Sequence, residues 1–302
     1  MTAPLRTAVI GTGHFGRYHA QKYASLPGSR FVAAVDRDIV RAAEVAGPLN
    51  AQAIADHREL FGKVDAVSIA VPTQAHFDVA RDCIANGLHV LIEKPITETL
   101  AQADELIRLA VQHNVILQVG HLQRFLLDRL GVIDLVRDPL YIECSRIAPF
   151  RPRGTDVGVT LDLMIHDIDL VLACVRSPVV AVDAVGAPVV STTEDIANTR
   201  LRFASGCVAT LTASRVSLKT ERKMRIFQRD AYVSIDLQSR KLAVIRKGRG
   251  EPWMPGLPPI DREEREYGEG DDLKTEIEGF LAAVSARRAP LVTGEDGRRA
   301  LE

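Results

Sequence analysis

The segment GVTLDLMIHDIDL, residues 158–170, combines the apolar residues of a buried helix with carboxylates and one imidazole. Burying such groups costs several kcal/mol unless they are paired or used. Asp162 and His166 are four positions apart, so a helix places both side chains on one face. Together they could hold a substrate hydroxyl, and His166, which titrates near neutrality, could accept its proton. The spacing indicates oxidation of an alcohol, in which carbon loses a hydride and oxygen loses a proton.

Two other interpretations of this helix stay open. His166 could be a core histidine whose ring is satisfied by Asp162. Alternatively, Asp162, His166 and Asp169 could converge as metal ligands, but transfer of a hydride to an organic acceptor requires no metal, so we expect none. Asp167 projects about 100° round the helix from His166. We expect Asp167 to pair with a surface group or with a group of the second domain.

The N-terminus predicts where a dinucleotide would bind. Residues 5–10 form a short apolar run, GTGHFG follows at once, and residues 17–25 can be helical. This order of strand, glycine-rich turn and helix is the fingerprint of a dinucleotide site, in which the exposed N–H groups of the helix start hold the pyrophosphate. The contacts expected in this turn come from Gly11, Gly13, His14, Phe15 and Gly16.

Asp36 ends a second apolar run, residues 31–35, about 20 residues after Gly16. A carboxylate at that distance belongs on the ribose, and because it repels a 2′-phosphate it favours NAD over NADP. Arg37 has the opposite effect, since it could pair with that phosphate or stack on adenine. The alternative is a glycine-rich surface turn followed by an unrelated aspartate at a strand end.

Apolar strands continue to alternate with helices, which predicts a parallel sheet covered on both faces. The expected strands are 64–71, 88–92 and 115–119, and the expected helices are 75–85 and 100–113. Ligands of such sheets bind at the carboxyl ends of the strands, and polar residues follow three successive strands here. They are Pro72, Thr73 and His76, then Glu93 and Lys94, then His121 and Arg124. We expect Arg124 and Lys94 to reach the substrate, and Lys94 and the remaining residues to contact the cofactor.

These motifs resemble the Gfo/Idh/MocA family of NAD(P)-dependent oxidoreductases over nearly the whole chain. The resemblance is carried by VIGTGHFGRYHA, AVPTQAHFDVA, VLIEKPIT, VGHLQRF and DLMIHDIDL. It implies that Lys94 stands beside the nicotinamide and the reacting hydroxyl, where a cation can stabilise the developing alkoxide. It also implies that Asp162 and His166 face the reacting carbon, with His166 as the base. Pro95 lies where the family bends the chain sharply, so a cis bond before it is possible.

The predicted fold is α/β, with two domains. Residues 1–121 are expected to form a Rossmann NAD-binding domain, and residues 122–302 an α+β domain that binds substrate and oligomerises. The second domain should contain a helix over 124–136, a loop over 250–272, and a helix over 273–286 that could pack back on the first domain. The family usually continues with a further helix after the equivalent of residue 297. Since the sequence stops at residue 302, we expect this last helix to be short. The expected strands of its open, mostly antiparallel sheet are 140–147, 179–190, 197–204, 207–214, 223–229, 231–237 and 241–246.

One face of that sheet should receive the Asp162 helix, and the other is free for self-association. We therefore expect a homo-dimer or homo-tetramer formed through the sheet, as is common in the family.

The net charge of −1 gives no general attraction to nucleic acid or to an anionic membrane. The chain shows no signal-peptide pattern and no apolar run of about 18 residues. Its four cysteines are scattered, which is typical of reduced thiols, so we expect a cytoplasmic protein.

The segment SRIAPFRPRGTD, residues 145–156, indicates the substrate. Its guanidinium groups suit a diphosphate, and its phenyl ring could cover a sugar or base. A solvated basic loop is the alternative, and a second basic run over 215–225 could either add phosphate contacts or form a charged strand edge. The residues expected to bind substrate are Lys94, Arg124, Arg146, Phe150, Arg151, Arg153, Asp162 and His166.

Within the family, APFRPRGTD followed by LDLMIHDID is similar to members that oxidise the carbon-3 hydroxyl of UDP-N-acetylglucosamine or of its uronic acid. In lipid A biosynthesis an aminotransferase converts the resulting 3-keto sugar nucleotide to an amine, so coupling to such an enzyme is possible. One alternative is a dehydrogenase of a free sugar or inositol. Another is a dinucleotide-sensing regulator without turnover, which would be expected to lose Lys94 or His166.

Overall fold

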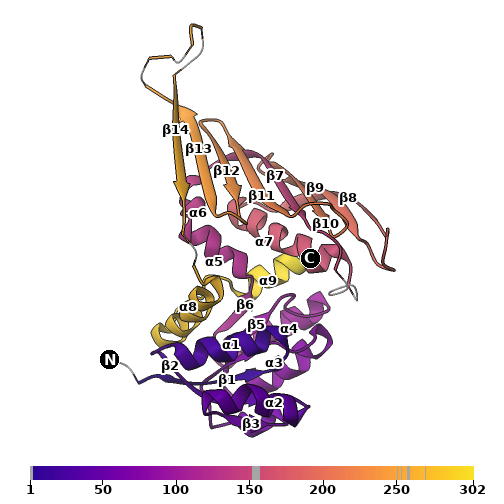
Figure 1. The fold of residues 1–302 in the computed structure, drawn as a ribbon, viewed down its shortest axis with the longest axis vertical. Coiled ribbons are helices and arrows are strands. Elements are labelled where there is room, and N and C mark those ends of the chain that lie inside the picture. Colours follow the sequence, from indigo (N-terminus) through magenta and orange to yellow (C-terminus); the bar gives the residue numbers. More distant parts are fainter. Residues whose placement is uncertain (1–2, 152–156, 250, 253, 257–258, 269) are drawn as a thin grey trace. The chain divides into compact units, whose positions relative to one another are not determined.

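The computed structural model describes all residues except 1–2, 152–156, 250, 253, 257–258 and 269 (Figure 1). Their contacts define two compact units, the first formed by residues 1–125 and 271–302 and the second by residues 126–270. The expected domain boundary after residue 121 lies close to the first break, and the C-terminal segment clusters with the first unit. Among the described residues, no helix has both the length and the apolar character needed to cross a bilayer.

The first unit is built on a parallel sheet of order β3-β2-β1-β4-β5-β6. This is the predicted doubly wound arrangement, and the strand order reverses beside β1, where such sheets bind their ligands. The short strand β3 and the helix α2 that precedes it were not predicted. The strands are β1 (Leu5–Ile10), β2 (Ser29–Val35), β3 (Gln52–Ile54), β4 (Ala66–Ile69), β5 (His89–Glu93) and β6 (Leu117–Gly120).

Helices cover both faces of this sheet, because successive strand residues point to opposite sides. Val9 packs with Tyr23 of α1 and Phe280 of α8 in one cluster. Its neighbour Ile10 belongs to the cluster on the other face, with Leu106 of α4. The C-terminal helix α8 therefore helps to cover one face of the sheet that contains β1. The helices are α1 (His14–Ser25), α2 (Ile39–Ala46), α3 (His76–Ala85), α4 (Leu100–Gln112), α8 (Asp272–Ala286) and the short α9 (Gly294–Leu301).

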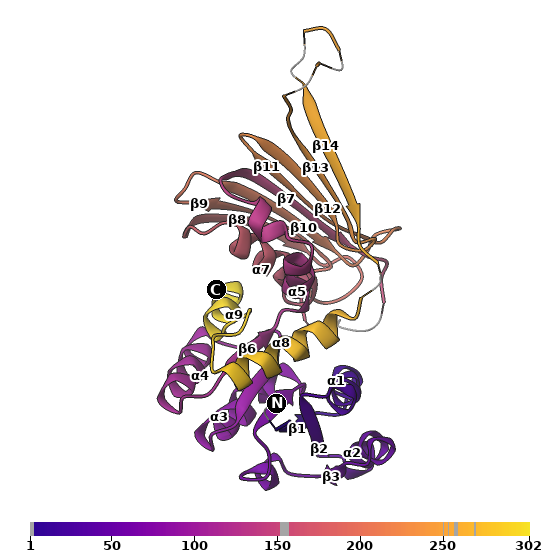
Figure 2. The same ribbon diagram turned by 90° about the vertical axis from the view of Figure 1, so that its left-hand side faces the viewer.

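The second unit contains a sheet of order β14-β13-β12-β11-β7-β10-β9-β8 (Figure 2). Only the β7–β10 pair is parallel among these neighbours, so the predicted open, mostly antiparallel sheet is confirmed. One face packs on α7 in a core that includes Ile142, Leu170 and Met224. The strands are β7 (Pro139–Ile147), β8 (Val179–Ala187), β9 (Ile196–Phe203), β10 (Val208–Ser214), β11 (Glu221–Gln228), β12 (Ala231–Asp236), β13 (Lys241–Lys247) and β14 (Ile260–Glu266).

Two predicted segments differ in the structure. The helix expected over 124–136 is divided into α5 (Leu122–Arg129) and α6 (Val132–Leu135), because Gly131 between them has φ +67°. The loop expected over 250–272 contains β14, which is exposed along its whole length and pairs with β13. Its sequence IDREERE has no apolar alternation, so it carries no strand pattern.

Candidate active site

The glycine-rich turn between β1 and α1 is packed too tightly for side chains at two of its three glycines. A Cβ atom on Gly16 would lie 1.7 Å from the carbonyl oxygen of Gly11, and one on Gly11 would lie 2.6 Å from that of Ala70. Gly11 also has φ +92°. Gly13 begins α1 and has open space around it. This turn fits a dinucleotide, since backbone and helix N–H groups are left accessible to a pyrophosphate. The predicted contacts His14 and Phe15 are exposed in the first turn of α1.

Asp36 lies just beyond β2, and its carboxylate is turned back toward this glycine turn. It accepts hydrogen bonds from the backbone N (2.9 Å) and Oγ1 (2.8 Å) of Thr12 and from the backbone N of Asp38 (3.0 Å). Burial alone would raise the pKa of Asp36, but these bonds and the charge on Arg41, 3.8 Å away, lower it overall. The side chain is thus held as a carboxylate, the form that binds ribose hydroxyls. Arg37 is exposed, and Arg41 is the arginine that pairs with Asp36.

His76 links the loops that follow β4 and β5. Its Nδ1 lies 2.8 Å from the carbonyl oxygen of Pro95 and its Nε2 lies 3.0 Å from that of Val71. Burial lowers the pKa of His76 despite these carbonyl contacts. The ring therefore positions the loop of Lys94, whose bond to Pro95 is cis, as the resemblance allowed. The other predicted residues of the first loop are Pro72 and Thr73, at the start of the short helix η3 (Thr73–Ala75).

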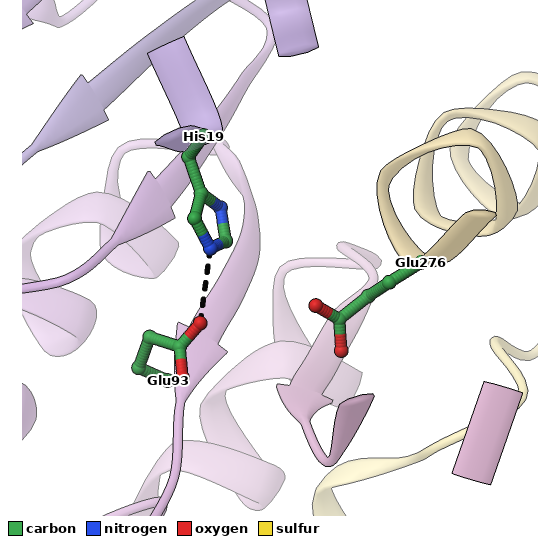
Figure 3. Close-up of side chains that lie close together, drawn as sticks. All are labelled: His19, Glu93 and Glu276. Atoms are coloured by element: carbon green, nitrogen blue, oxygen red, sulfur yellow. Dashed lines mark hydrogen bonds and ion pairs between the residues drawn. The ribbon is translucent and has the colours of Figure 1, made fainter. Parts of the chain in front are cut away.

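Glu93, at the end of β5, is hydrogen-bonded to a histidine that sequence reasoning missed. Its Oε1 lies 2.9 Å from Nε2 of His19 on α1, and Nδ1 of His19 lies 3.0 Å from Ser68 Oγ (Figure 3). Burial would raise the pKa of Glu93, but the His19 bond and the charges on His19 and Lys94 lower it. His19 lies within the motif VIGTGHFGRYHA, where a polar residue on the buried face of an amphipathic helix was the available signal.

The end of β6 carries His121 and Arg124, both buried. The backbone N of Arg124 donates to the carbonyl oxygen of His121 at 2.9 Å, which begins α5. The Arg124 guanidinium lies 4.0 Å from Asp296 of α9. Asp296 also caps α9 by accepting from the backbone N of Thr293. Arg124, expected at the substrate, thus has a carboxylate neighbour within its own unit.

Asp162 and His166 lie in the second unit on a helix that starts with a wider turn than predicted. Residues Thr160–Met164 form the π-helical turn η4, which continues directly into α7 (Ile165–Cys174). The α-helix expected over this whole stretch is therefore wrong for residues 160–164, where the structure has a π turn. Both side chains are half-buried, which leaves them accessible to a ligand. Single π turns inside α-helices occur frequently at functional sites.

Arg146, predicted to bind substrate, is instead buried in an ion pair with Asp167. Its Nη2 lies 2.6 Å from Oδ1 and its Nε lies 3.0 Å from Oδ2 of that residue. The pair joins β7 to α7 and identifies the partner of Asp167 as a second-unit group, one of the two alternatives expected. Phe150 and Arg151 are exposed, and Arg153 lies outside the described residues.

Arg215, from the second basic run, also has an internal role. Its Nε lies 2.7 Å from Oδ1 of Asp195, and its Nη1 donates to the carbonyl oxygen of Val157 at 2.8 Å. The backbone N of Val159 donates to the carbonyl oxygen of Glu194 at 2.9 Å. These contacts fix the residues immediately before η4, so Arg215 anchors the start of the helix that carries Asp162.

Comparisons with known proteins agree with this organisation. The model of the oxidoreductase family with an NAD-binding Rossmann fold matches residues 5–121, and the model of the GFO/IDH/MocA C-terminal domain matches residues 143–233. UDP-N-acetylglucosamine 3-dehydrogenase of Acidithiobacillus ferrooxidans is 41% identical, over 98% of this chain and 94% of that protein. A solved structure of that dehydrogenase has a TM-score of 0.93, covering 99% of this chain and 95% of the other. Myo-inositol 2-dehydrogenase of Thermotoga maritima is 26% identical over 98% of this chain and 93% of its own.

Proposed function

Because this chain belongs to the Gfo/Idh/MocA family of NAD-binding oxidoreductases, we propose that it oxidises the carbon-3 hydroxyl of UDP-N-acetylglucosamine to a ketone. The observation that carries the substrate assignment is the 41% identity, over nearly the full length of both chains, to a dehydrogenase of that sugar nucleotide. Inositol dehydrogenases match at lower identity, so a free polyol is the alternative substrate to compare with UDP-N-acetylglucosamine.

NAD, when bound, supplies the hydride acceptor. The turn from Gly11 to Gly16 and the first N–H groups of α1 would hold its pyrophosphate, because Gly13 carries no side chain at the helix start and has open space around it. Asp36 would accept hydrogen bonds from the adenosine ribose. Its carboxylate is kept ionised by Thr12, and an anion at this place disfavours a 2′-phosphate. Arg41 compensates part of that charge, which weakens the discrimination against NADP but leaves NAD favoured.

We assign the proton transfer to His166. Asp162 would accept a hydrogen bond from the substrate and fix its orientation, and His166 would take the proton of the reacting hydroxyl. Lys94 would keep a positive charge near the oxygen as it becomes an alkoxide. The carbon–hydrogen bond breaks with its electron pair, which leaves as hydride, and the oxygen–hydrogen bond loses a proton, so the product is a ketone.

The UDP moiety requires cations and a flat apolar surface. Since Arg146 is paired with Asp167, we assign the diphosphate to Arg151 and Arg153 and the ring contact to Phe150, which is exposed.

We further propose that the chain works in the cytoplasm as a homo-dimer or homo-tetramer. The interface would be the sheet face where the ring of Phe227 contacts those of Tyr141 and Tyr232. An aminotransferase would then consume the 3-keto product.

The test is NADH absorbance with purified protein, NAD and UDP-N-acetylglucosamine, with a ketone trap because formation of the ketone can be uphill. Parallel reactions contain NADP, glucose, myo-inositol or the UDP-uronic acid. We expect signal with NAD and UDP-N-acetylglucosamine. Turnover of a free polyol alone would overturn the substrate and the roles of Arg151 and Arg153. NAD binding without turnover of any of these compounds would favour a dinucleotide sensor.

A further inference from the structure

Three side chains, two of them fully buried, converge inside the first unit from segments far apart in the sequence. His19 comes from α1, Glu93 from β5 and Glu276 from α8, and Figure 3 shows the Glu276 carboxylate directed toward the other two. One donor atom from each lies within 4.8 Å of the others. His19 and Glu276 are fully buried, and the Glu93 side chain is 16% exposed.

Glu276 is the unusual member of this cluster. Among the described residues, neither of its carboxylate oxygens has a hydrogen-bond partner, although the side chain is fully buried. Next to it, the buried Gln118 places Nε2 3.4 Å from the backbone carbonyl oxygen of Glu276, while its Oε1 has no partner within the described part of the chain. Burying a carboxylate without compensation is very costly. Burial and then the charge on Glu93 raise the pKa of Glu276, so these oxygens need either a proton or a bound cation.

Among the residues that the structure describes, the distances leave no proton shared between Glu276 and either neighbour, and they are compatible with a metal ion. A proton joins two oxygens only when they are about 2.5–3.0 Å apart, and no such bond joins Glu276 to Glu93 or His19 among the described contacts. Bonds of about 2.0–2.5 Å to a metal ion allow its ligand atoms to be up to about 4–5 Å apart. The cluster, with all three donor atoms within 4.8 Å of one another, has that size.

We propose that His19, Glu93 and Glu276 form a binding site for one divalent transition-metal ion of the Zn²⁺ or Mn²⁺ class. One imidazole and two carboxylates are a donor set for these ions, and the two carboxylates balance the charge. Ser68 Oγ lies 3.0 Å from Nδ1 of His19 and 2.8 Å from the hydroxyl of Tyr23. Such a bond to the second ring nitrogen orients a metal-ligating histidine. The ion would connect α1 and β5 to the C-terminal helix α8, which gives it a structural role.

The test is the metal content of the untagged full-length chain after dialysis against Zn²⁺ or Mn²⁺ and removal of free metal. We expect about one equivalent in the wild type, and about one equivalent less in Glu276→Gln. Glu278→Gln is the matched control, because Glu278 is exposed on the same helix, and it should retain the metal. Metal should raise the melting temperature of the wild type and of the control, and leave that of Glu276→Gln unchanged.

A wild-type chain without stoichiometric metal, or a Glu276→Gln variant that retains as much as the wild type, would overturn the site and leave a protonated Glu276 as its explanation. X-ray absorption on the metal-loaded wild type keeps the test decisive if the variant does not fold. The expected ligands are one imidazole nitrogen and carboxylate oxygens. A shell of thiolates, of several imidazoles or of water alone would place the metal elsewhere. No readout uses turnover, so the result is independent of the proposed reaction.

Discussion

Arg146 and Asp167 form a bidentate ion pair between β7 and α7, with Nη2–Oδ1 and Nε–Oδ2 distances of 2.6 and 3.0 Å. Their side chains are 4% and 3% exposed. Removing one partner leaves the other charge buried without compensation, which costs about 3–5 kcal/mol. We therefore expect Arg146→Met to lower the free energy of unfolding by about that amount, measured by urea denaturation.

The matched control is Arg225→Met on the neighbouring strand β11. Arg225 pairs with Glu143 at 3.0 Å, but both side chains are more than two-fifths exposed, at 43% and 42%. A solvent-exposed ion pair contributes about 0–1 kcal/mol to stability, so we expect little change in the free energy of unfolding. If Arg146→Met were as mild as the control and raised only the KM for the UDP-sugar, Arg146 would be a substrate ligand after all.

The same pair shows what a sequence can and cannot predict. Arg146 lies beside Phe150 and Arg151, and a run of arginines near a helix with catalytic residue types suits a diphosphate. Whether a guanidinium faces solvent or a carboxylate 21 positions later depends on how β7 packs on α7. That packing is a tertiary contact without a local signal. Glu276 was missed for the same reason, since it meets His19 only after the C-terminal helix covers the first sheet.

Local patterns were informative where backbone geometry itself is under constraint. The glycines of GTGHFG and the position of Asp36 predicted the turn and the strand end, because tight turns and parallel strands leave few residue choices. The π-helical turn at Asp162 has no such pattern, so an ordinary α-helix was predicted. Strand β14 was missed because pairing with β13, rather than burial, holds its charged residues in the sheet.

Gly16 should tolerate no side chain. In Gly16→Ala the new Cβ would lie 1.7 Å from a backbone oxygen, so α1 must move away from β1. We expect loss of NAD binding and a decrease in unfolding free energy of about 1–3 kcal/mol, measured by NADH fluorescence titration and urea denaturation. Gly13→Ala is the control, since its Cβ meets nothing within 4 Å. It should change stability by less than about 1 kcal/mol. Equal stability of both variants would show that α1 can shift freely.

Asp36→Ala should weaken NAD binding without altering the chemical step. Hydrogen bonds to a charged group contribute about 1.5–3 kcal/mol, so we expect roughly a 10- to 150-fold higher Kd for NAD and a smaller preference over NADP. Asp38→Ala is the control, because Asp38 caps α2 by accepting from the backbone N of Val40 at 3.1 Å. It should cost about 1 kcal/mol of stability and leave cofactor preference unchanged. An unchanged Kd in Asp36→Ala would disprove the ribose contact.

Lys94→Ala and His166→Ala should each reduce turnover by on the order of 100-fold or more while NAD binding is largely kept. The loss has different causes, since Lys94 stabilises the alkoxide and His166 accepts the proton. Steady-state kinetics and NADH fluorescence separate kcat from cofactor binding. His113→Ala, at the exposed end of α4, should leave both unchanged. Near-normal turnover in His166→Ala would remove it as the base.

His89 should make stability depend on pH. Its Nδ1 accepts a hydrogen bond from the backbone N of Ile116 at 2.8 Å, which requires an unprotonated nitrogen. Burial and then the charge on Arg287 lower the pKa of His89 from 6.5 to about 4, against a smaller opposing effect of Asp65. Between those values the unfolded chain binds more protons than the folded one, so stability rises with pH. The contribution is complete above about pH 6.5 and is lost as pH falls toward 4.

A shift of this size corresponds to about 3 kcal/mol, because each pKa unit is about 1.4 kcal/mol. We expect the urea unfolding free energy of the wild type to fall between pH 7 and pH 4 more steeply than that of His89→Gln. Carboxylates that titrate in this range contribute to both proteins, so the difference between the two curves isolates His89. His113→Gln should follow the wild type. Parallel curves for the wild type and His89→Gln would mean that the Ile116 hydrogen bond does not hold His89 neutral, and that another group controls the acid sensitivity of the first unit.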